Sequence, residues 1–317
     1  MRKSLFVLLM KGVGLIVLIY VLITFLTSYD FKGIFEAYIP EKEESSEEVD
    51  DSPTYLDITF IDVGQGDATL VECDGKYMLV DGGMPEYSDT IYSILQKKDI
   101  HYLDVIVATH DHADHVGGLS GALEYVNVGT VYSSVDSSDN TSFQMFKEEV
   151  EAKGKEITVV KAGYSFMLGR ATVDVLGPVN DSDEPNNMSL VLKISLGDAS
   201  VLIMGDAERD EIQDILNFGA DVSADVIRIS HHGSGNGTTY PLLYEVNPTY
   251  AIISCGKDND YGHPMDSVLS KLQNAEITLF RTDLQGDISM YYDGETITIV
   301  PDHGKTVDVW VPGDSLE

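Results

Sequence analysis

The chain has 317 residues, of which 53 are acidic and 20 are basic, and its formal net charge is −33 at pH 7. Hydrophobic residues make up 43% of the chain, which allows a sizeable core and excludes wholesale disorder. Affinity for duplex nucleic acid depends largely on Lys and Arg side chains that neutralise phosphates, and no basic run is present, so we expect no strong duplex binding. The acidity is interpreted as a solvated surface, with some carboxylates left to surround cations.

The amino terminus carries an apolar stretch, residues 5–27, in which Lys11 is the one charged residue. About 20 such residues are enough for a membrane-spanning helix, so residues 1–30 are predicted to be a single transmembrane anchor. Arg2 and Lys3 precede the stretch, and positive residues prefer the cytoplasmic side. We therefore expect a single-pass protein of the cell membrane with its body outside the cytoplasm. Secretion after signal cleavage is the alternative.

A charged segment follows, and residues 41–53 read EKEESSEEVDDSP. Like charges repel and few apolar residues are present, so residues 31–54 are predicted to be an extended acidic linker. The folded domain is expected to occupy residues 55–317.

Strands and helices alternate along this domain. Apolar runs bounded by turn residues predict strands at residues 56–63, 68–73, 77–81, 104–109, 128–133, 157–160, 171–176, 189–195, 200–204, 226–230, 250–254 and 277–281. Helical spacing predicts helices at residues 90–97, 116–125, 208–218 and 267–274. This order indicates two sheets between helical layers. Cys73 and Cys255 lie in or beside apolar runs and are expected to be small buried hydrophobes, while their spacing leaves a disulfide open.

A dense group of potential metal ligands lies between the strand at 104–109 and the helix at 116–125. It comprises His110, Asp111, His112, Asp114 and His115. Imidazole nitrogen and carboxylate oxygen are the donors of zinc and related divalent ions. Four donors on one turn cannot all face one ion without strain, but they can be divided between two ions. We predict that His110 and His112 bind one ion and that Asp114 and His115 bind the other.

This stretch resembles the His-x-His-x-Asp-His signature of the metallo-β-lactamase superfamily. Further motifs occur in order at residues 62–68, 80–83, 186–192, 204–206, 230–234 and 261–264. The whole set is similar to the soluble hydrolase domain of ComEC, the DNA-uptake channel protein, and to its stand-alone secreted relatives. The resemblance covers roughly residues 55–300. It implies an α/β fold, the αβ/βα four-layer sandwich, with a dinuclear metal site along one edge.

The resemblance also implies roles for other residues. Asp206 would bridge both ions, and either His231 or His232 would complete the shell of the second ion, although spacing does not decide which. Asp81 would lie behind the site and orient a ligand histidine, unless it is only a turn carboxylate. His263 would face the substrate and protonate the leaving group, unless it is only an exposed turn histidine. The cofactors would be two divalent metal ions, with zinc favoured and manganese as the alternative.

The sequence departs from the superfamily pattern at one point. Many members have a histidine ligand between the first cluster and the bridging aspartate, but residues 116–206 contain no histidine. Asn186, Asn187 and Ser189 occupy the matching region. We therefore expect the first ion to be weakly held, with water or an amide oxygen in place of the missing imidazole.

Together these features predict a metal-dependent hydrolase in which hydroxide shared by the two ions attacks an ester or phosphodiester. Asp114 and His263 are the predicted catalytic side chains. The ComEC-like motifs suggest nuclease action on single-stranded DNA in connection with competence. A choline-phosphate or other cell-surface or cell-wall ester is the competing substrate, and a catalytically silent, metal-stabilised binding module is the third alternative. β-Lactam hydrolysis is not favoured, because the middle histidine is missing.

Overall fold

Two β-sheets form the framework of residues 55–304, the part of the chain that the computed structural model describes. These residues fall within one compact unit, Pro53–Glu317. The predicted anchor and acidic linker lie outside the described residues, and their boundaries stay predictions. Within residues 55–304, no helix is both long and apolar enough to cross a membrane.

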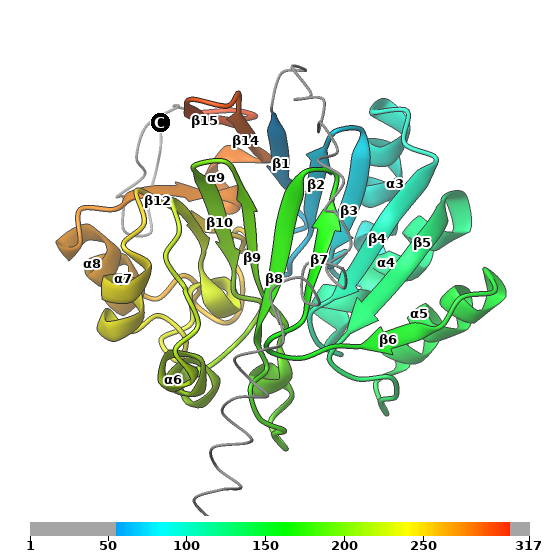
Figure 1. The fold of residues 1–317 in the computed structure, drawn as a ribbon, viewed down its shortest axis with the longest axis horizontal. Helices are drawn as coiled ribbons and strands as arrows, with labels where there is room; N and C mark the ends of the chain where they lie inside the picture. Colours follow the sequence, from blue (N-terminus) through cyan, green and yellow to red (C-terminus); the bar gives the residue numbers. More distant parts are fainter. Residues whose placement is uncertain (1–54, 305–317) are drawn as a thin grey trace, which may run out of the picture. The chain divides into compact units, whose positions relative to one another are not determined.

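The first sheet has eight strands in the order β15-β14-β1-β2-β3-β4-β5-β6. These are β1 (Leu56–Phe60), β2 (Thr69–Cys73), β3 (Lys76–Val80), β4 (Tyr102–Ala108), β5 (Asn127–Ser133), β6 (Ile157–Val159), β14 (Ile288–Tyr292) and β15 (Ile297–Pro301). Figure 1 shows β14 beside β1, with β15 at the sheet edge, so strands from both ends of the described residues belong to the same sheet.

The second sheet has seven strands in the order β13-β12-β11-β10-β9-β8-β7. These are β7 (Ser165–Leu168), β8 (Ala171–Gly177), β9 (Val191–Leu196), β10 (Ala199–Ile203), β11 (Val226–Arg228), β12 (Tyr250–Ile253) and β13 (Thr278–Arg281). The strands from β10 to β13 pair in parallel, and so do β3, β4, β5 and β6.

Helices cover the outer faces of both sheets (Figure 1). On the first sheet these are α3 (Ser88–Lys97), α4 (Ala113–Tyr125) and α5 (Thr141–Ala152), and on the second they are α6 (Arg209–Phe218), α7 (Tyr240–Val246) and α8 (Asp266–Asn274). Short helical turns complete the fold: η1 (Pro85–Tyr87), η2 (Pro185–Met188), η3 (Ser230–Gly233) and α9 (Thr282–Gln285).

Alternating burial along the strands shows why four layers form. In β4, Val105 and Val107 belong to the core between the sheets, whereas Ile106 packs against the outer helices. In β10, Val201 and Ile203 face the core between the sheets. A strand that is buried on both faces reads as a nearly continuous apolar run, which is the pattern that the sequence shows. The predicted αβ/βα sandwich is confirmed for the described residues.

Both cysteines are free and buried, and they lie in different core regions. Cys73 belongs to the core between the sheets, whereas Cys255 packs among the helices on the second sheet. Burial raises the pKa of both thiols. The prediction that they act as small buried hydrophobes is confirmed.

The sequence prediction missed several elements and displaced several boundaries; β1 ends at Phe60 rather than at 63, and β9 begins at Val191 rather than at 189. The prediction lacked α5, α7, β7, β14 and β15. Helix α4 begins at Ala113 rather than at 116, because its first turn carries the polar donors Asp114 and His115 instead of an apolar stripe. An aspartate in the first turn favours the helix, since it lies near the positive end of the helix dipole.

Candidate metal centre

Side chains from distant parts of the chain meet where parallel strands of both sheets end. Thr109 and the histidine cluster follow β4, while Asp81 follows β3. Asp206 follows β10, and His231 and His232 follow β11. Carboxyl ends of parallel strands lie at the same edge of a sheet, so each sheet contributes its donors to one edge of the sandwich.

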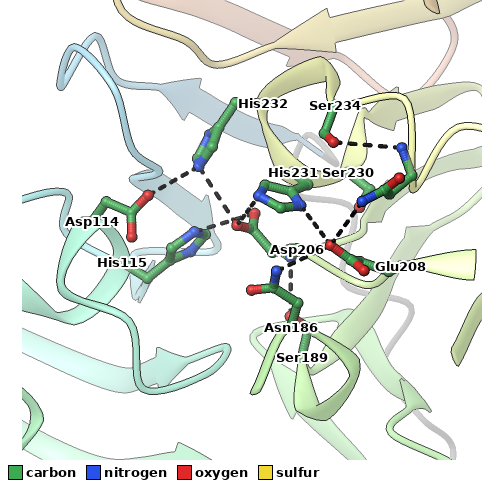
Figure 2. Close-up of polar contacts among 12 residues, drawn as sticks. Asp114, His115, Asn186, Ser189, Asp206, Glu208, Ser230, His231, His232 and Ser234 are labelled. Atoms are coloured by element: carbon green, nitrogen blue, oxygen red, sulfur yellow. Dashed lines mark hydrogen bonds and ion pairs between the residues drawn. The ribbon is translucent and has the colours of Figure 1, made fainter. Parts of the chain in front are cut away.

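Four of the predicted ligands form a tight cluster at this edge (Figure 2). The donor atoms of Asp114, His115, Asp206 and His232 all lie within 4.8 Å of one another. His232 Nε2 lies 3.3 Å from Asp114 Oδ2 and 3.6 Å from Asp206 Oδ2. Two imidazoles and two carboxylates at such distances are a donor set that suits zinc or a similar divalent ion.

Asp206 occupies the centre of the site. Its Oδ1 lies 3.2 Å from His115 Nε2, and its Oδ2 lies 3.7 Å from His231 Nε2. Burial alone would raise the pKa of this carboxyl, but the positive charges that His115 and His232 can carry hold the pKa well below its usual range. The carboxylate is therefore kept ionised in a buried position, with oxygens on two sides available for cations.

Asp81 lies behind His115, as the sequence predicts. Its Oδ2 lies 2.8 Å from His115 Nδ1 and also accepts a hydrogen bond from the Thr109 hydroxyl at 2.7 Å. Its Oδ1 accepts the Thr109 amide at 2.8 Å. A proton on His115 Nδ1 thus satisfies Asp81 and leaves Nε2 directed at Asp206, which is how a carboxylate orients a ligand imidazole. Burial alone would lower the pKa of His115, but Asp206 and Asp81 together raise the pKa well above its usual value.

Burial would likewise raise the pKa of Asp114, but the hydrogen bond from His232 and the charge of His115 hold the pKa below its usual range. This carboxylate is only partly buried, and it faces the opening of the site from the first turn of α4.

His110 and His112 lie next to this cluster. Their ring centroids are 4.6 Å apart, and those of His110 and His115 are 4.2 Å apart. Among residues 55–304, however, no group of three mutually close His, Cys, Asp or Glu donors includes His110 or His112. This agrees with the absence of a middle histidine from the sequence. Burial, together with the charge of His115, holds the pKa of His110 well below its usual value.

The region that replaces the missing histidine is built around two side chains. Ser189 Oγ accepts the backbone N–H of Asp206 at 3.0 Å and lies 3.4 Å from His110 Nδ1. A proton on His110 Nδ1 can thus be donated to Ser189, which leaves Nε2 free. The Nδ2 of Asn186 donates to Glu208 at 3.2 Å, while its Oδ1 is buried and has no hydrogen-bond partner among the described residues.

The structure separates the two neighbouring histidines, which spacing alone could not do. His232 is buried and joins the four-residue cluster, and its Nδ1 lies 3.0 Å from the carbonyl oxygen of Ser254. His231 is partly exposed, and its Nδ1 lies 3.2 Å from Glu208 Oε1 (Figure 2). Both have left-handed backbones, with φ of 51° and 53°, which costs about 1–3 kcal/mol each for residues other than glycine. Such strain at adjacent positions is typical of a functional turn.

His263 also lies at this edge, and its predicted catalytic role stays a prediction. Its ring centroid is 5.7 Å from that of His231 and 6.5 Å from that of His232. Burial and the two neighbouring histidines lower the pKa of His263 to about 4. Its imidazole is therefore neutral near pH 7.

Three residues of the site were not predicted. Glu208 contacts His231, as described above. Arg228 is wholly buried, forms an ion pair with Asp67, and donates to the carbonyl oxygen of Gly205 at 2.7 Å. One signal was available in the sequence, because Arg228 is a lone charged residue in an apolar run, which indicates a buried partner.

Polar atoms without hydrogen bonds show that these residues fit metal ions. His110 Nε2 is buried and has no hydrogen-bond partner within residues 55–304. His115 Nε2 and Asp206 Oδ1, also buried, face each other at 3.2 Å but are not joined by a hydrogen bond of good geometry. Buried polar groups are nearly always hydrogen-bonded, so unpartnered donor atoms that converge on one place indicate an absent ligand. The donor set therefore fits two divalent cations. The cation at Asp114, His115 and His232 would be better enclosed than the cation at His110 and His112.

Comparisons with known proteins agree with this geometry. The family model described as Metallo-beta-lactamase superfamily matches residues 61–257. ComE operon protein 3 of Bacillus subtilis (strain 168) is 29% identical over 266 residues, which cover 77% of this chain and 34% of that protein. Recombination protein 2 of Haemophilus influenzae is 30% identical over 256 residues, which cover 78% of this chain and 30% of that protein. The chain thus spans about a third of the length of these curated relatives.

Two solved structures share the fold at low sequence identity. The metallo-beta-lactamase fold protein YhfI from Bacillus subtilis superposes with a TM-score of 0.53 at 12% identity, covering 75% of this chain and 100% of its own. The CmlA beta-hydroxylase has a TM-score of 0.50 at 17% identity, covering 75% of this chain and 53% of its own. The match over residues 61–257, with the site assembled at the predicted edge, shows that the chain belongs to the metallo-β-lactamase superfamily.

Proposed function

We propose that this protein is a metal-dependent phosphodiesterase that cleaves single-stranded nucleic acid. One observation carries the proposal: the donor atoms of Asp114, His115, Asp206 and His232 converge at the edge of the sandwich, three of these residues are buried, and His115 Nε2 and Asp206 Oδ1 form no hydrogen bond. A cluster with this composition is suited to hydrolysis, because the cations it can hold activate water and offset negative charge on a substrate.

The residues divide into two proposed ligand sets that share Asp206. Asp114, His115 and His232 would hold one ion, and His110 and His112 would hold the other, with the Oδ1 of Asn186 as a weak additional donor. When bound, such ions lower the pKa of water and offset negative charge on a phosphate.

The side chains of this chain perform the remaining tasks. Asp81 fixes the orientation of the His115 ring through their 2.8 Å contact. Glu208 holds the Nδ1 side of His231, so the other ring nitrogen is directed towards the site. His231, partly exposed at the rim, is thereby placed to exchange a proton with the leaving group. His263 lies beside it and would take part in the same transfer.

The comparisons and the charge of the chain support a single strand as the substrate. Two relatives are named "Competence protein ComA" and "Recombination protein 2", and both names suggest a role that involves nucleic acid. A chain with a net charge of −33 is unsuited to tight electrostatic binding of a duplex, whose charge density is high. A single strand can instead be held by a few contacts to phosphates and bases.

Hydrolysis by the full chain tests this proposal. With zinc or manganese added, the protein should cleave bis-p-nitrophenyl phosphate and a single-stranded oligodeoxynucleotide faster than a phosphocholine diester or a β-lactam. The double variant His110→Ala/His112→Ala should lose this turnover. The matched control is His101→Ala, because the His101 side chain is 79% exposed and lies far from the site at the start of β4. Turnover that survives in the double variant would refute the assignment, and a preference for the phosphocholine diester would favour a cell-surface substrate.

We also propose that residues 1–30 anchor the chain in the cell membrane with the hydrolase domain outside the cytoplasm. The apolar run and the positive residues before it support this orientation. Protease added to intact cells should then degrade the hydrolase domain, and detergent should be needed to extract the full chain. A soluble form in the medium whose sequence starts after residue 27 would instead indicate signal cleavage.

A further inference from the structure

A cavity of about 740 Å³ lies between loops that also contact the segments of the metal centre. Loops that hold the site form two of its walls, and its lining includes Gly64, Gln65, Tyr87, Gly256, Lys257 and Asn259. The first loop continues to Asp67, whose amide donates to the carbonyl oxygen of Asp114 at 3.0 Å. The second follows Ser254, whose carbonyl oxygen lies 3.0 Å from His232 Nδ1. The cavity therefore shares two loops with the metal centre, and its volume lies in the usual range for small-molecule sites.

The second loop, residues 256–264, is held in a defined shape by Asn259. The Nδ2 of this side chain donates to the carbonyl oxygens of Gly256 at 2.8 Å and His263 at 2.6 Å. Its Oδ1 accepts the amides of Tyr261 at 3.1 Å and His263 at 3.0 Å. Groups carried by this loop are thus positioned before a ligand arrives, which reduces the entropy lost on binding.

Lys257 provides a positive charge at the cavity. It is exposed and forms no ion pair with the described residues 55–304, although the chain is strongly acidic. Of the carboxylates that line the cavity, Asp283 is already paired with Arg281, with its Oδ2 2.6 Å from the guanidinium. Asp62 is partly satisfied by the amide of Gly64 at 3.1 Å. The Lys257 ammonium is therefore free to contact an anionic group of a ligand.

Tyr261 provides an aromatic surface on the same loop. Its side chain is 68% exposed and stacks on His263, with ring centroids 5.8 Å apart and an angle of 26° between the planes. The His263 ring in turn lies 5.7 Å from the His231 ring. The Tyr261 ring is therefore connected to the metal centre through the rings of His263 and His231. An exposed, stacked ring on the same loop as an unpaired lysine is a combination that can bind unpaired bases and their phosphates.

We propose that residues 256–264 and the adjoining cavity form a binding platform for an unpaired nucleic-acid strand, in which Lys257 contacts a phosphate and Tyr261 stacks on a base. This inference rests on the proposed function, since it assigns the platform to the strand that the metal centre cleaves. Asp258 and Asp260, both exposed, lie in the same loop. The platform would therefore hold a polyanion through the single charge of Lys257 and through stacking, rather than through a basic surface.

Binding can be measured without cleavage, by fluorescence anisotropy of a labelled 12-mer of thymidylate with the full chain in a chelator. Lys257→Gln should weaken binding several-fold and should reduce the slope of log K against log salt by about 0.7, the value for one phosphate contact on a single strand. Tyr261→Leu should weaken binding at least about fivefold, because stacking of one base contributes about 1–3 kcal/mol. It should have no effect on a 12-mer without bases.

Matched controls are Lys155→Gln, an exposed lysine between α5 and β6, and Tyr244→Leu, a tyrosine on α7 that is 81% exposed. The platform is wrong if wild type fails to bind the strand, if the controls weaken binding as much as the test variants, or if neither test variant weakens it. It is also wrong if Tyr261→Leu affects the base-free strand equally, or if a polyol-phosphate polymer binds as tightly as thymidylate. Turnover of bis-p-nitrophenyl phosphate, measured in parallel, separates the two proposals, because it depends on the metal centre and requires no strand.

Discussion

Arg228 and Asp67 form a wholly buried ion pair that joins the two sheets beneath the metal centre. Arg228 ends β11 in the second sheet, and Asp67 lies just before β2 in the first. The guanidinium also lies 3.3 Å from His232 Nδ1 and donates to the carbonyl oxygen of Gly205, the residue before Asp206. Burial lowers the pKa of Arg228 to about 9, which leaves the guanidinium charged at neutral pH. The ion pair therefore stabilises the segments that carry Asp206 and His232, two of the proposed metal ligands.

Asp67→Asn is expected to lower the free energy of unfolding by about 3–5 kcal/mol, because it leaves a buried charge without its partner. Urea denaturation should show a lower midpoint with an unchanged slope. The control is Asp181→Asn, since Asp181 is 82% exposed in its pair with Lys161 and its replacement should leave the midpoint nearly unchanged. Equal effects of the two variants would contradict a special role for the buried pair.

Replacing His232 is expected to lower the metal content, whereas replacing His231 is expected to lower turnover. His232→Ala should reduce the bound metal by about one ion per chain, because His232 is a member of the donor cluster. His231→Ala should keep its metal and lose turnover by about 10²–10⁴-fold, the usual contribution of a proton-transfer group. Elemental analysis of the purified variants, together with bis-p-nitrophenyl phosphate kinetics, tests this difference. The reverse pattern would exchange the two roles.

Gly118→Ala is expected to damage both folding and metal binding. A methyl group at Gly118 would lie 2.0 Å from the carbonyl oxygen of Gly82. The two segments cannot separate easily, because the Gly118 amide donates to Gly83 O at 2.9 Å and the Gly82 amide to His115 O at 2.7 Å. We expect a loss of about 1–3 kcal/mol or more in urea denaturation, with reduced metal content.

Gly235→Ala is the control for this glycine prediction. Its added methyl group would meet the flexible end of Met265, 3.1 Å away, instead of backbone. If Gly118→Ala were as stable as Gly235→Ala, the close contact between Gly118 and Gly82 would not be required for stability.

Glu211 should make stability depend on pH. Burial raises the pKa of this carboxyl to about 7 from its ordinary value of 4.5. Because the unfolded chain releases this proton more readily, wild-type stability should fall as pH rises from about 4.5 through 7, by up to about 3 kcal/mol. Glu211→Gln cannot ionise and keeps an oxygen that can accept the Val179 amide, which lies 2.8 Å from Glu211 Oε1.

The stability of Glu211→Gln relative to wild type should therefore increase between pH 5 and pH 8, measured as urea midpoints across this range. Glu151→Gln, at an exposed position of α5, is the control and should show a constant difference. A constant difference for position 211 as well would mean that Glu211 ionises freely in the folded state.

Residues near one another in the sequence could be interpreted without the structure. The donors between His110 and His115 lie on one strand-to-helix turn, so their shared location needs no long-range contact. The apolar runs before Asp81 and Asp206 predict strands, and the ends of parallel strands meet at one edge. Helix α5 was missed because its stripe of Phe143, Phe146 and Val150 is short and interrupted by charge.

The sequence by itself indicated two sheets between helical layers and the donor cluster from His110 to His115, because local apolar periodicity and local donor density encode these features. The site's position at one edge and the roles expected of Asp206 and the His231–His232 pair came from the resemblance to the metallo-β-lactamase superfamily. Only the tertiary structure decided between His231 and His232, paired Arg228 with Asp67, and brought the loop with Lys257 beside the metal centre. Those relationships depend on how strands distant in sequence align and on which way a strained turn directs each ring. A linear pattern contains neither kind of information.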